Sequence, residues 1–359
     1  MITDTGYLLP LCRHERPVER ETIEYLRWLC NTVAEVVVVD GSPAHIFALH
    51  RQLLPAGVRH VAPAASETGL NGKAAGVRTG MRLLRTDFAI IGDDDVRYDA
   101  ASLAAVRAAL ADADVVRPQN YFVPRPWHAL LDEGRSLIAR ATGGDWPGTL
   151  GVRLETYRGC GGYDADVLFE NFELVRTIRA AGGREVCAAD VFVARRPPTF
   201  QHYAGQRVRQ AYDEFARPRR LAFQLAFAPA IVALICRSGA YGAVGGWLAA
   251  MAVAEYGRRR RNGTLAFRFD ATLFAPLWVL ERAVTSWCAV VLRLRGGVRY
   301  SRGRIRKAAN RDISHRTACP VGTEPRPTYL RLPGFSEDIT QSEVGLDGLP
   351  RRATASRVR

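Results

Sequence analysis

The chain is 359 residues long, with 48% hydrophobic and 24% charged residues, 32 glycines and 19 prolines. This composition excludes a collagen-like chain, a coiled coil and a wholly disordered protein. The net charge of +14 is unevenly spread, because residues 1–216 carry 25 basic and 27 acidic side chains whereas residues 217–316 carry 19 and 4. Since the basic excess coincides with the most apolar stretch, it favours an anionic membrane surface as partner over a nucleic acid.

Strand and helix patterns alternate along the first half of the chain. The bare apolar runs at 35–39 and 88–91 are typical of parallel strands buried on both faces. Repeated βα units predict an α/β fold with an open, mostly parallel sheet that binds ligands beyond the carboxyl ends of its strands. Residues 127–163, rich in glycine, proline and aromatic residues, are expected to form a loop-rich region. The other expected strands are 6–11, 57–62, 115–118 and 191–193, and the expected helices are 18–31, 44–54, 72–84, 100–111, 166–181 and 206–215.

Two apolar stretches, 221–236 and 239–256, follow this half and are flanked by arginines. They predict either a membrane hairpin with both ends in the cytoplasm or two buried helices of a soluble subdomain. Residues 270–294 are also apolar but carry Glu281-Arg282, which favours an interfacial helix or a segment packed on a partner.

The chain therefore divides into a catalytic domain (1–216), an apolar and basic membrane-associated helical region (217–310) and a tail (311–359) expected to be disordered. The seven scattered cysteines and the absence of a signal-peptide pattern at the start predict a domain on the cytoplasmic face of the cell membrane.

Two acidic turns follow the buried strands. Asp93-Asp94-Asp95 directly follows residues 88–91, and adjacent carboxylates repel one another unless a cation sits beside them. The triplet therefore indicates either a divalent metal that bridges a diphosphate or a solvated acidic turn. Asp40 ends the run at 35–39, where it could accept hydrogen bonds from a nucleoside or form an Asx turn.

Three further segments carry polar groups suited to a phosphate or to proton transfer. Lys73 opens an expected helix, where an ammonium and backbone N–H groups can converge on a phosphate. A general base could come from residues 170–173, which read Glu-Asn-Phe-Glu, unless these acids only complement a helix N-terminus. Gln206 and Arg209 suit contacts to a diphosphate, and a solvated helix face is the alternative.

The order of these motifs resembles the family 2 glycosyltransferases with the GT-A fold, a Rossmann-like fold with a mostly parallel sheet. The chain is most similar to their membrane-associated branch, which includes ceramide glucosyltransferase, and the resemblance covers residues 6–310, including the basic segment 296–304. It implies an inverting enzyme that moves a hexose from a nucleoside diphosphate sugar, UDP-linked, to a hydroxyl of a lipid or lipid-linked acceptor. The implied cofactor is Mg²⁺ or Mn²⁺.

The resemblance also assigns individual residues. Nucleotide-sugar contacts are implied for Asp40, Lys73, Asp93, Asp94, Gln206, Arg209 and, by a looser match, Glu15. Asp93 and Asp95 would be the metal-binding pair, and Glu170 and Asn171 match the family's Glu-Asp pair.

Two departures from the family pattern affect the acceptor side. An amide cannot take up a hydroxyl proton at neutral pH, so Glu170 or Glu173 would replace Asn171 as base. Gln210 stands where the family has tryptophan, and Trp127 or Trp146 could supply the aromatic face for the acceptor instead. These departures leave open a membrane-anchored, non-catalytic scaffold on a degenerate glycosyltransferase fold.

Overall fold

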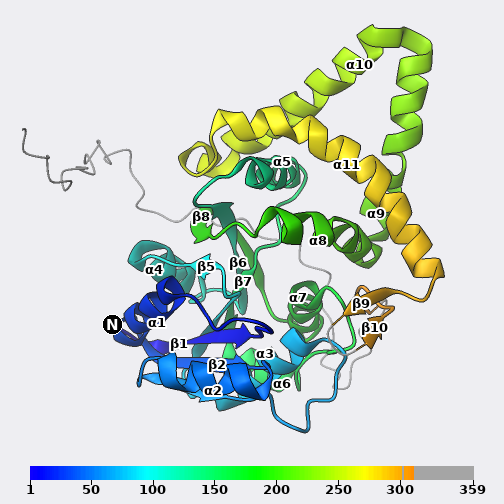
Figure 1. The fold of residues 1–359 in the computed structure, drawn as a ribbon. Coiled ribbons are helices and arrows are strands. Elements are labelled where there is room, and N and C mark those ends of the chain that lie inside the picture. Colours follow the sequence, from blue (N-terminus) through cyan, green and yellow to red (C-terminus); the bar gives the residue numbers. More distant parts are fainter. Residues whose placement is uncertain (301–302, 311–359) are drawn as a thin grey trace, which may run out of the picture.

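The computed structural model describes residues 1–300 and 303–310 and centres on one eight-stranded sheet within that part of the chain (Figure 1). The tail 311–359 lies outside the described residues. In spatial order the strands are β3 (Val58–Val61), β2 (Val33–Asp40), β1 (Ile2–Leu11), β4 (Phe88–Gly92), β7 (Thr149–Arg153), β6 (Val115–Phe122), β8 (Glu185–Arg195) and β5 (Val96–Arg97).

All strands of this sheet except β7 and β5 run in the same direction. β3, β2, β1 and β4 pair in parallel, β7 runs antiparallel between β4 and β6, and β8 pairs in parallel with β6. The expected α/β class and mostly parallel sheet are therefore confirmed. Because β1, β2 and β4 are neighbours with one direction, their carboxyl ends meet at one edge.

Helices cover both faces of the sheet. The helices before the apolar region are α1 (Arg20–Thr32), α2 (Ala44–Leu53), α3 (Gly72–Leu83), α4 (Ala100–Ala109), α5 (Trp127–Ala141), α6 (Leu154–Gly159), α7 (Glu170–Ala180) and α8 (Phe200–Tyr212), the last of which packs on α11 rather than on the sheet.

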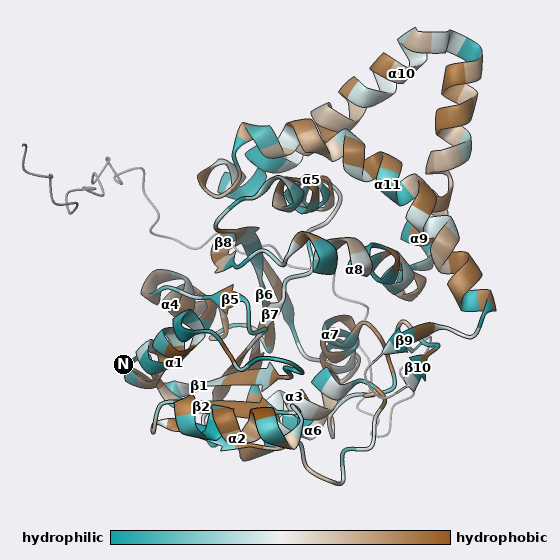
Figure 2. Ribbon diagram, in the orientation of Figure 1, coloured by the Kyte–Doolittle hydropathy of each residue, from teal (hydrophilic) through white to brown (hydrophobic). Residues whose placement is uncertain are grey.

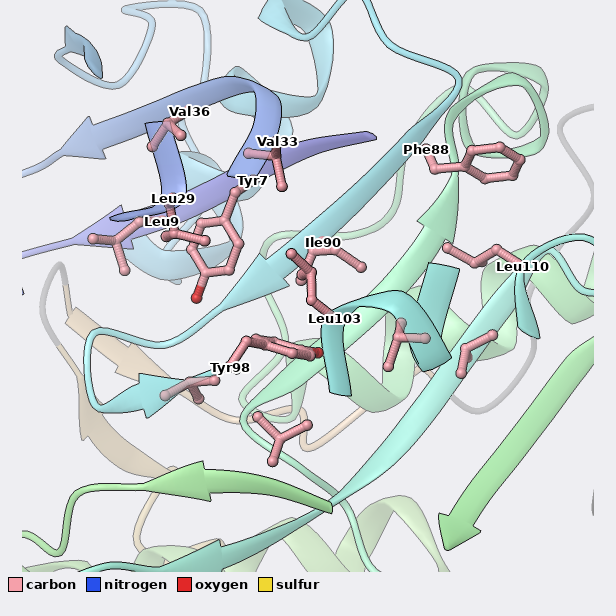
Figure 3. Packing of buried hydrophobic residues seen from close by; sticks show 14 of the residues in the cluster. Tyr7, Leu9, Leu29, Val33, Val36, Phe88, Ile90, Tyr98, Leu103 and Leu110 are labelled. Carbon is pink, nitrogen blue, oxygen red and sulfur yellow. The ribbon is translucent and has the colours of Figure 1, made fainter. Parts of the chain in front are cut away.

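Residues that alternate along each strand pack on opposite faces. Val36 and Val38 of β2 join one core with α1 and α4, part of which Figure 3 shows around Tyr7, Leu29 and Leu103. Val37 and Val39 join the other core with α3 and α7. Burial on both faces explains the bare apolar runs of the sequence.

The region 127–163 differs from the expectation of a loop-rich segment. It contains the 15-residue helix α5, strand β7 and helix α6. The buried face of α5 carries Asp132, Ser136 and Arg140 among its apolar residues, and these polar side chains obscure the helical hydrophobic period.

The apolar region after α8 contains a 3₁₀ turn (Asp213–Ala216), α9 (Pro218–Leu225), α10 (Phe227–Arg259), a second 3₁₀ turn (Arg260–Leu265) and α11 (Phe269–Leu294). Gly239, with a φ of 53°, breaks α10 into the two arms of a hairpin that projects from the sheet domain (Figure 1). The turn lies beside Arg237-Ser238, where the sequence predicts it.

Two helical stretches of the described chain are long and apolar enough to cross a membrane. The most apolar 18-residue window has a mean hydropathy of 1.7 in Pro218–Leu265 and 1.3 in Phe269–Leu294. Only 11% of the most apolar window is buried in the first stretch, against 39% in the second, and Figure 2 shows the apolar character of both.

Helix α11 packs one side along α5 and α8, with Arg282 and Ser286 buried there. Its opposite side exposes apolar residues every three or four positions: Phe269, Leu273, Leu277, Leu280, Val284, Trp287, Val291 and Leu294. After α11, β9 (Val298–Tyr300) and β10 (Gly303–Ile305) form a small hairpin beside α7 (Figure 1).

Candidate functional site

A cavity of about 530 Å³ opens at the shared edge formed by the carboxyl ends of β1, β2 and β4. Its lining comes from nine separate segments of the chain, including the turn after β2, the start of α3, the turn after β4, the start of α7 and helix α8. Of the residues singled out in the sequence, those brought together here are Lys73, Asp93, Asp94, Asp95, Glu170, Gln206 and Arg209. The two acidic turns thus lie side by side, with Gly41 from the first and the triplet from the second on the same wall.

Each carboxylate of the triplet is paired with a basic side chain. Asp93 Oδ1 lies 2.5 Å from Lys73 Nζ, and Asp94 Oδ2 lies 2.6 Å from a guanidinium nitrogen of Arg13. Arg195, at the end of β8, donates from Nε to Asp95 Oδ2 at 2.8 Å and reaches Asp93 Oδ2 at 3.5 Å. These cations offset the repulsion between adjacent carboxylates.

One buried oxygen of the triplet has no partner among the described residues. Asp95 Oδ1 is buried and has no hydrogen-bond partner among the described residues. Burial, together with the neighbouring carboxylates of Asp93 and Asp94, raises the pKa of Asp95 despite the opposing guanidinium of Arg195. A buried carboxylate oxygen of this kind is a suitable ligand for a hard divalent cation.

A larger residue at position 148 would displace the side chain of Asp93. Asp93 N donates to Gly148 O at 2.9 Å, and a Cβ atom on Gly148 would lie 2.6 Å from Asp93 Oδ2. Glycine at this position therefore lets β7 hold the acidic turn from one side.

Lys73 owes its position to the cap of α3. The side chain of Asn71 accepts from the backbone N–H groups of Lys73 and Ala74 at 3.1 and 3.2 Å, and its amide donates to Val167 O at 2.9 Å. The ammonium of Lys73 then bridges Asp93 and Glu170 Oε1, the latter at 2.7 Å. Burial opposes the charge, but these two carboxylates raise the pKa of Lys73 above its ordinary value.

The first turn of α7 distinguishes the three candidates for the base. Glu170 lines the cavity, whereas Asn171 is buried and donates from Nδ2 to Pro147 O at 3.1 Å. Glu173 is 2% exposed and accepts from the backbone N–H and the side-chain amide of Asn310, at 3.1 and 2.7 Å. Only Glu170 of the three therefore faces a ligand-sized space.

Helix α8 lines the opposite side of the cavity with His202, Gln206 and Arg209. The guanidinium of Arg209 lies 4.4 Å from the ring centroid of Tyr300, which also lines the cavity. Burial opposes the charge, and Tyr300, Asp213 and Glu170 together raise the pKa of Arg209. Burial raises the pKa of nearby Asp213 to about 7.

Asp40 lies behind the cavity wall rather than on it. It is 1% exposed, and its carboxylate accepts from Ser42 N at 2.9 Å, His50 Nδ1 at 2.6 Å and His60 Nε2 at 3.0 Å. Burial opposes ionisation, but these three hydrogen bonds lower the pKa of Asp40. The expected direct contact with a nucleoside does not fit this burial, and the carboxylate instead fixes the turn that presents Gly41.

The Asp40, His50 and His60 ligand atoms lie within 4.8 Å of one another, close enough for a metal ion. However, Val18 N donates to His50 Nε2 at 3.0 Å, so the proton of a neutral His50 must be on Nδ1, the atom beside Asp40. A protonated nitrogen cannot ligate a metal, and this group is therefore a hydrogen-bonded network.

Three other residues singled out in the sequence do not line the cavity. Glu15 is exposed on the loop after β1, where Arg13 and His14 take its expected place beside the triplet. Trp127 is 55% exposed at the start of α5 and contacts Phe200 with ring centroids 4.9 Å apart. Trp146 lies beneath the guanidinium of Arg117, whose Cζ is 4.0 Å from the centroid of the Trp146 ring.

Sequence reasoning missed Arg195, His14, His202 and Tyr300. Arg195 stands 100 residues from Asp95, and no local motif connects them. The strand pattern 191–193 was the available signal, because an arginine just beyond that strand lies at the same sheet edge as the triplet.

The charges that line the cavity define what it can bind. Among its described residues four carboxylates face three cations, and Arg13, which pairs with Asp94 from outside the lining, brings the group close to neutral. Guanidinium and ammonium groups suit phosphate oxygens, a carboxylate suits a hydroxyl group, and the acidic triplet suits a divalent cation.

No family model matches the sequence, and no curated protein matches it. Among solved structures the chain is similar to the mannosyltransferase PcManGT from Pyrobaculum calidifontis in complex with GDP-Man and Mn²⁺. The identity is 18% and the TM-score 0.42, over 79% of this chain and 87% of that one.

Two further solved structures match about half of this chain. GalNAc-T7 with UDP, GalNAc and Mn²⁺ is 13% identical with a TM-score of 0.38, over 54% of this chain and 44% of that one. S. aureus TarS 1–349 in complex with UDP-GlcNAc is 13% identical with a TM-score of 0.35, over 56% and 60%. Likenesses of this degree do not establish a family or an activity.

Proposed function

We propose that this protein is an inverting glycosyltransferase of family 2 with the GT-A fold. It transfers a hexose from a nucleoside diphosphate sugar, UDP-linked, to a hydroxyl of a lipid or lipid-linked acceptor. The observation that carries the proposal is the convergence in one cavity of the acidic triplet from the turn after β4 with Lys73, Glu170 and Arg209 from three different helices.

The donor binds with its diphosphate between the triplet and α8. Gln206 and Arg209 donate to its oxygens, and the positive end of the α3 dipole at Gly72 faces the same space. The apolar wall of Leu11, Val39 and Pro63 suits the nucleoside base.

A divalent cation fits the donor set at this wall. The four carboxylates of the lining would repel a diphosphate that approached them alone, and Asp95 Oδ1 is a buried oxygen without a partner among the described residues. Asp93 and Asp95 would hold Mg²⁺ or Mn²⁺, and the bound ion would supply positive charge that stabilises the departing diphosphate.

Glu170 acts as the general base. Its carboxylate takes the proton of the acceptor hydroxyl, and the hydroxyl oxygen forms a bond to the anomeric carbon from the face opposite the diphosphate. The bond from that carbon to the diphosphate breaks, its electron pair leaves with the diphosphate, and the anomeric configuration inverts. The ammonium of Lys73 lies 2.7 Å from Glu170 Oε1 and holds the carboxylate in position.

The membrane side of the proposal rests on exposed apolar surface. The α10 hairpin and the outer stripe of α11 would be costly to leave in water, and arginines such as Arg219, Arg268 and Arg295 border them. The α10 hairpin inserts into the cell membrane from the cytoplasmic side, and α11 lies along the interface with its polar face on α5 and α8.

The decisive experiment incubates the full chain in membranes with labelled UDP-sugars and Mn²⁺ and separates lipid from aqueous products. Labelled lipid of inverted anomeric configuration is expected, and Asp95→Ala is expected to abolish it. Protein that neither binds UDP nor turns over any UDP-sugar would contradict the proposal.

A membrane-anchored scaffold without catalysis is the second candidate, and one observation favours it. Asp93, Asp94 and Asp95 are all ion-paired with basic side chains of the chain itself. An unchanged cellular phenotype in the Asp95→Ala variant would support the scaffold.

A further inference from the structure

A second cavity, of about 360 Å³, lies between α7, the start of α9 and the loop that follows α5. It shares no lining residue with the first cavity. The proposed function gives it no role.

This cavity is strongly basic. Its described lining contains one acidic residue, Glu185, and five arginines: Arg117, Arg176, Arg179, Arg217 and Arg220. Two further carboxylates outside the lining, Glu173 and Glu214, pair with arginines of the set. Even when both are counted, the described residues of the group keep a net charge of about +2.

The arginines are held in fixed positions. Arg117 is 4% exposed, donates from Nε to Glu185 Oε1 at 2.6 Å and donates to Asp145 O at 2.7 Å. Arg217 pairs with Glu214 at 2.9 Å, yet its Nε is buried with no hydrogen-bond partner among the described residues. A buried guanidinium N–H without a partner points to an acceptor that binds there.

Aromatic and apolar side chains complete the wall. The rings of Trp146 and Phe172 lie 5.0 Å apart at an angle of 70°, and Val175 follows Phe172 by one helical turn on α7. The cavity therefore offers several donors for an anion beside a small apolar surface, and arginine forks match the oxygens of a phosphate.

We propose that this second cavity binds the phosphate group of an anionic ligand. The phosphate could belong to the head group of an anionic phospholipid or to a soluble phosphate ester. Arg217 and Arg220 flank the first turn of α9, which leads into the apolar helix α10 (Figure 1). The cavity therefore lies next to the segment proposed to enter the membrane, where phospholipid phosphates are found.

The test uses the full chain in detergent and measures binding of radiolabelled inorganic phosphate by equilibrium dialysis. The double variant Arg179→Gln/Arg220→Gln is expected to weaken binding by roughly tenfold or more, because it removes two charged donors. Arg27→Gln/Arg51→Gln is the matched control, since both arginines are exposed on α1 and α2. Arg209→Gln, in the first cavity, is expected to keep the phosphate binding that Arg179→Gln/Arg220→Gln removes.

Vesicles then identify the source of the phosphate. Displacement of bound phosphate by phosphatidylcholine vesicles that contain phosphatidic acid, but not by pure phosphatidylcholine, assigns the site to lipid head groups. If neither kind of vesicle displaces the bound phosphate, the site is assigned to soluble phosphate esters. Three results overturn the proposal: no saturable phosphate binding, an equal loss in the Arg27→Gln/Arg51→Gln control, or a loss confined to Arg209→Gln.

Discussion

Replacing Glu170 with glutamine tests the proposed base most directly. The amide has nearly the same shape, and its oxygen can still accept from Lys73 at the position where Glu170 Oε1 now lies, 2.7 Å away. Lys73 also keeps Asp93 at 2.5 Å, so the substitution leaves no ammonium unpaired. What is lost is the ability to accept the acceptor's proton.

The expected loss follows from the size of general-base catalysis. A positioned base contributes about 10²–10⁴-fold in rate, or roughly 3–5 kcal/mol of the barrier. The folded state should lose only about 1 kcal/mol, because one of the two partners of Lys73 is retained in full and the other in part. Glu170→Gln should therefore lower kcat by 10²–10⁴-fold and leave thermal stability nearly unchanged.

Glu173→Gln is the matched control three residues along the same helix. Its carboxylate accepts two N–H groups of Asn310, and an amide would place a donor against one of these donors. The cost should be about 1–3 kcal/mol of folding free energy, with kcat changed by less than about threefold. Both variants are assayed for UDP-sugar turnover at saturating donor and for thermal unfolding.

Two results would refute this reasoning. If Glu170→Gln kept kcat within about threefold of the parent, Glu170 would not be the base. If Glu173→Gln lost kcat as severely as Glu170→Gln while unfolding at the parent temperature, the assignment of the base to Glu170 alone would fail.

Three further outcomes are expected. Burial raises the pKa of Asp213 from 3.8 to about 7, so its proton stabilises the fold fully below about pH 4, and this contribution is lost as the pH rises through 7. At pH 8, Asp213→Asn should therefore unfold at a higher temperature than the parent, with a free energy of unfolding larger by about 1–3 kcal/mol. The exposed control Asp112→Asn should unfold at the parent temperature. Cys236, exposed next to the α10 turn, should react with an impermeant maleimide added outside right-side-out vesicles, and Cys12 only after permeabilisation; protection of Cys236 would show that the turn does not cross. Removal of divalent cations with a chelator should abolish turnover, Mn²⁺ should restore it, and full activity in the chelator would refute the metal's role.

The sheet and its ligand-binding edge could be predicted because their signals are local. The runs at 35–39 and 88–91 are apolar on both faces, and the acidic turns that end them had to meet at one edge of a parallel sheet. Helix α5 could not be recognised in the same way. Its buried face carries Asp132, which pairs with Arg135 at 2.9 Å and Arg207 at 3.3 Å. A hydrophobic pattern counts such a charged residue as exposed, although its ion pairs allow it to be buried.

The direction of the polar side chains could not be predicted from the sequence either. Asp40 follows its strand as expected, yet its carboxylate turns inward to His50 and His60, which stand 10 and 20 residues along the chain. Asn171 and Glu170 are adjacent, but the helix turns one toward Pro147 and the other toward the cavity. A motif gives the position of a residue on its element, and only packing decides where its polar atoms point.

The sequence predicts neither the ion pairs of Arg195 nor the direction of its side chain, and its position has a measurable consequence. Its guanidinium occupies Asp95 Oδ2 and lies near Asp93 Oδ2, so a divalent cation that used these oxygens would have to displace it. Arg195→Gln removes this competitor and should tighten Mn²⁺ binding to the protein without nucleotide by roughly tenfold, the worth of one charge-assisted hydrogen bond. The concentration of free Mn²⁺, followed by electron paramagnetic resonance, measures this affinity without any turnover. Arg196→Gln is the control, because Arg196 pairs with Glu21 instead. Unchanged or weaker Mn²⁺ binding in Arg195→Gln would show that the metal does not use the oxygens that Arg195 holds.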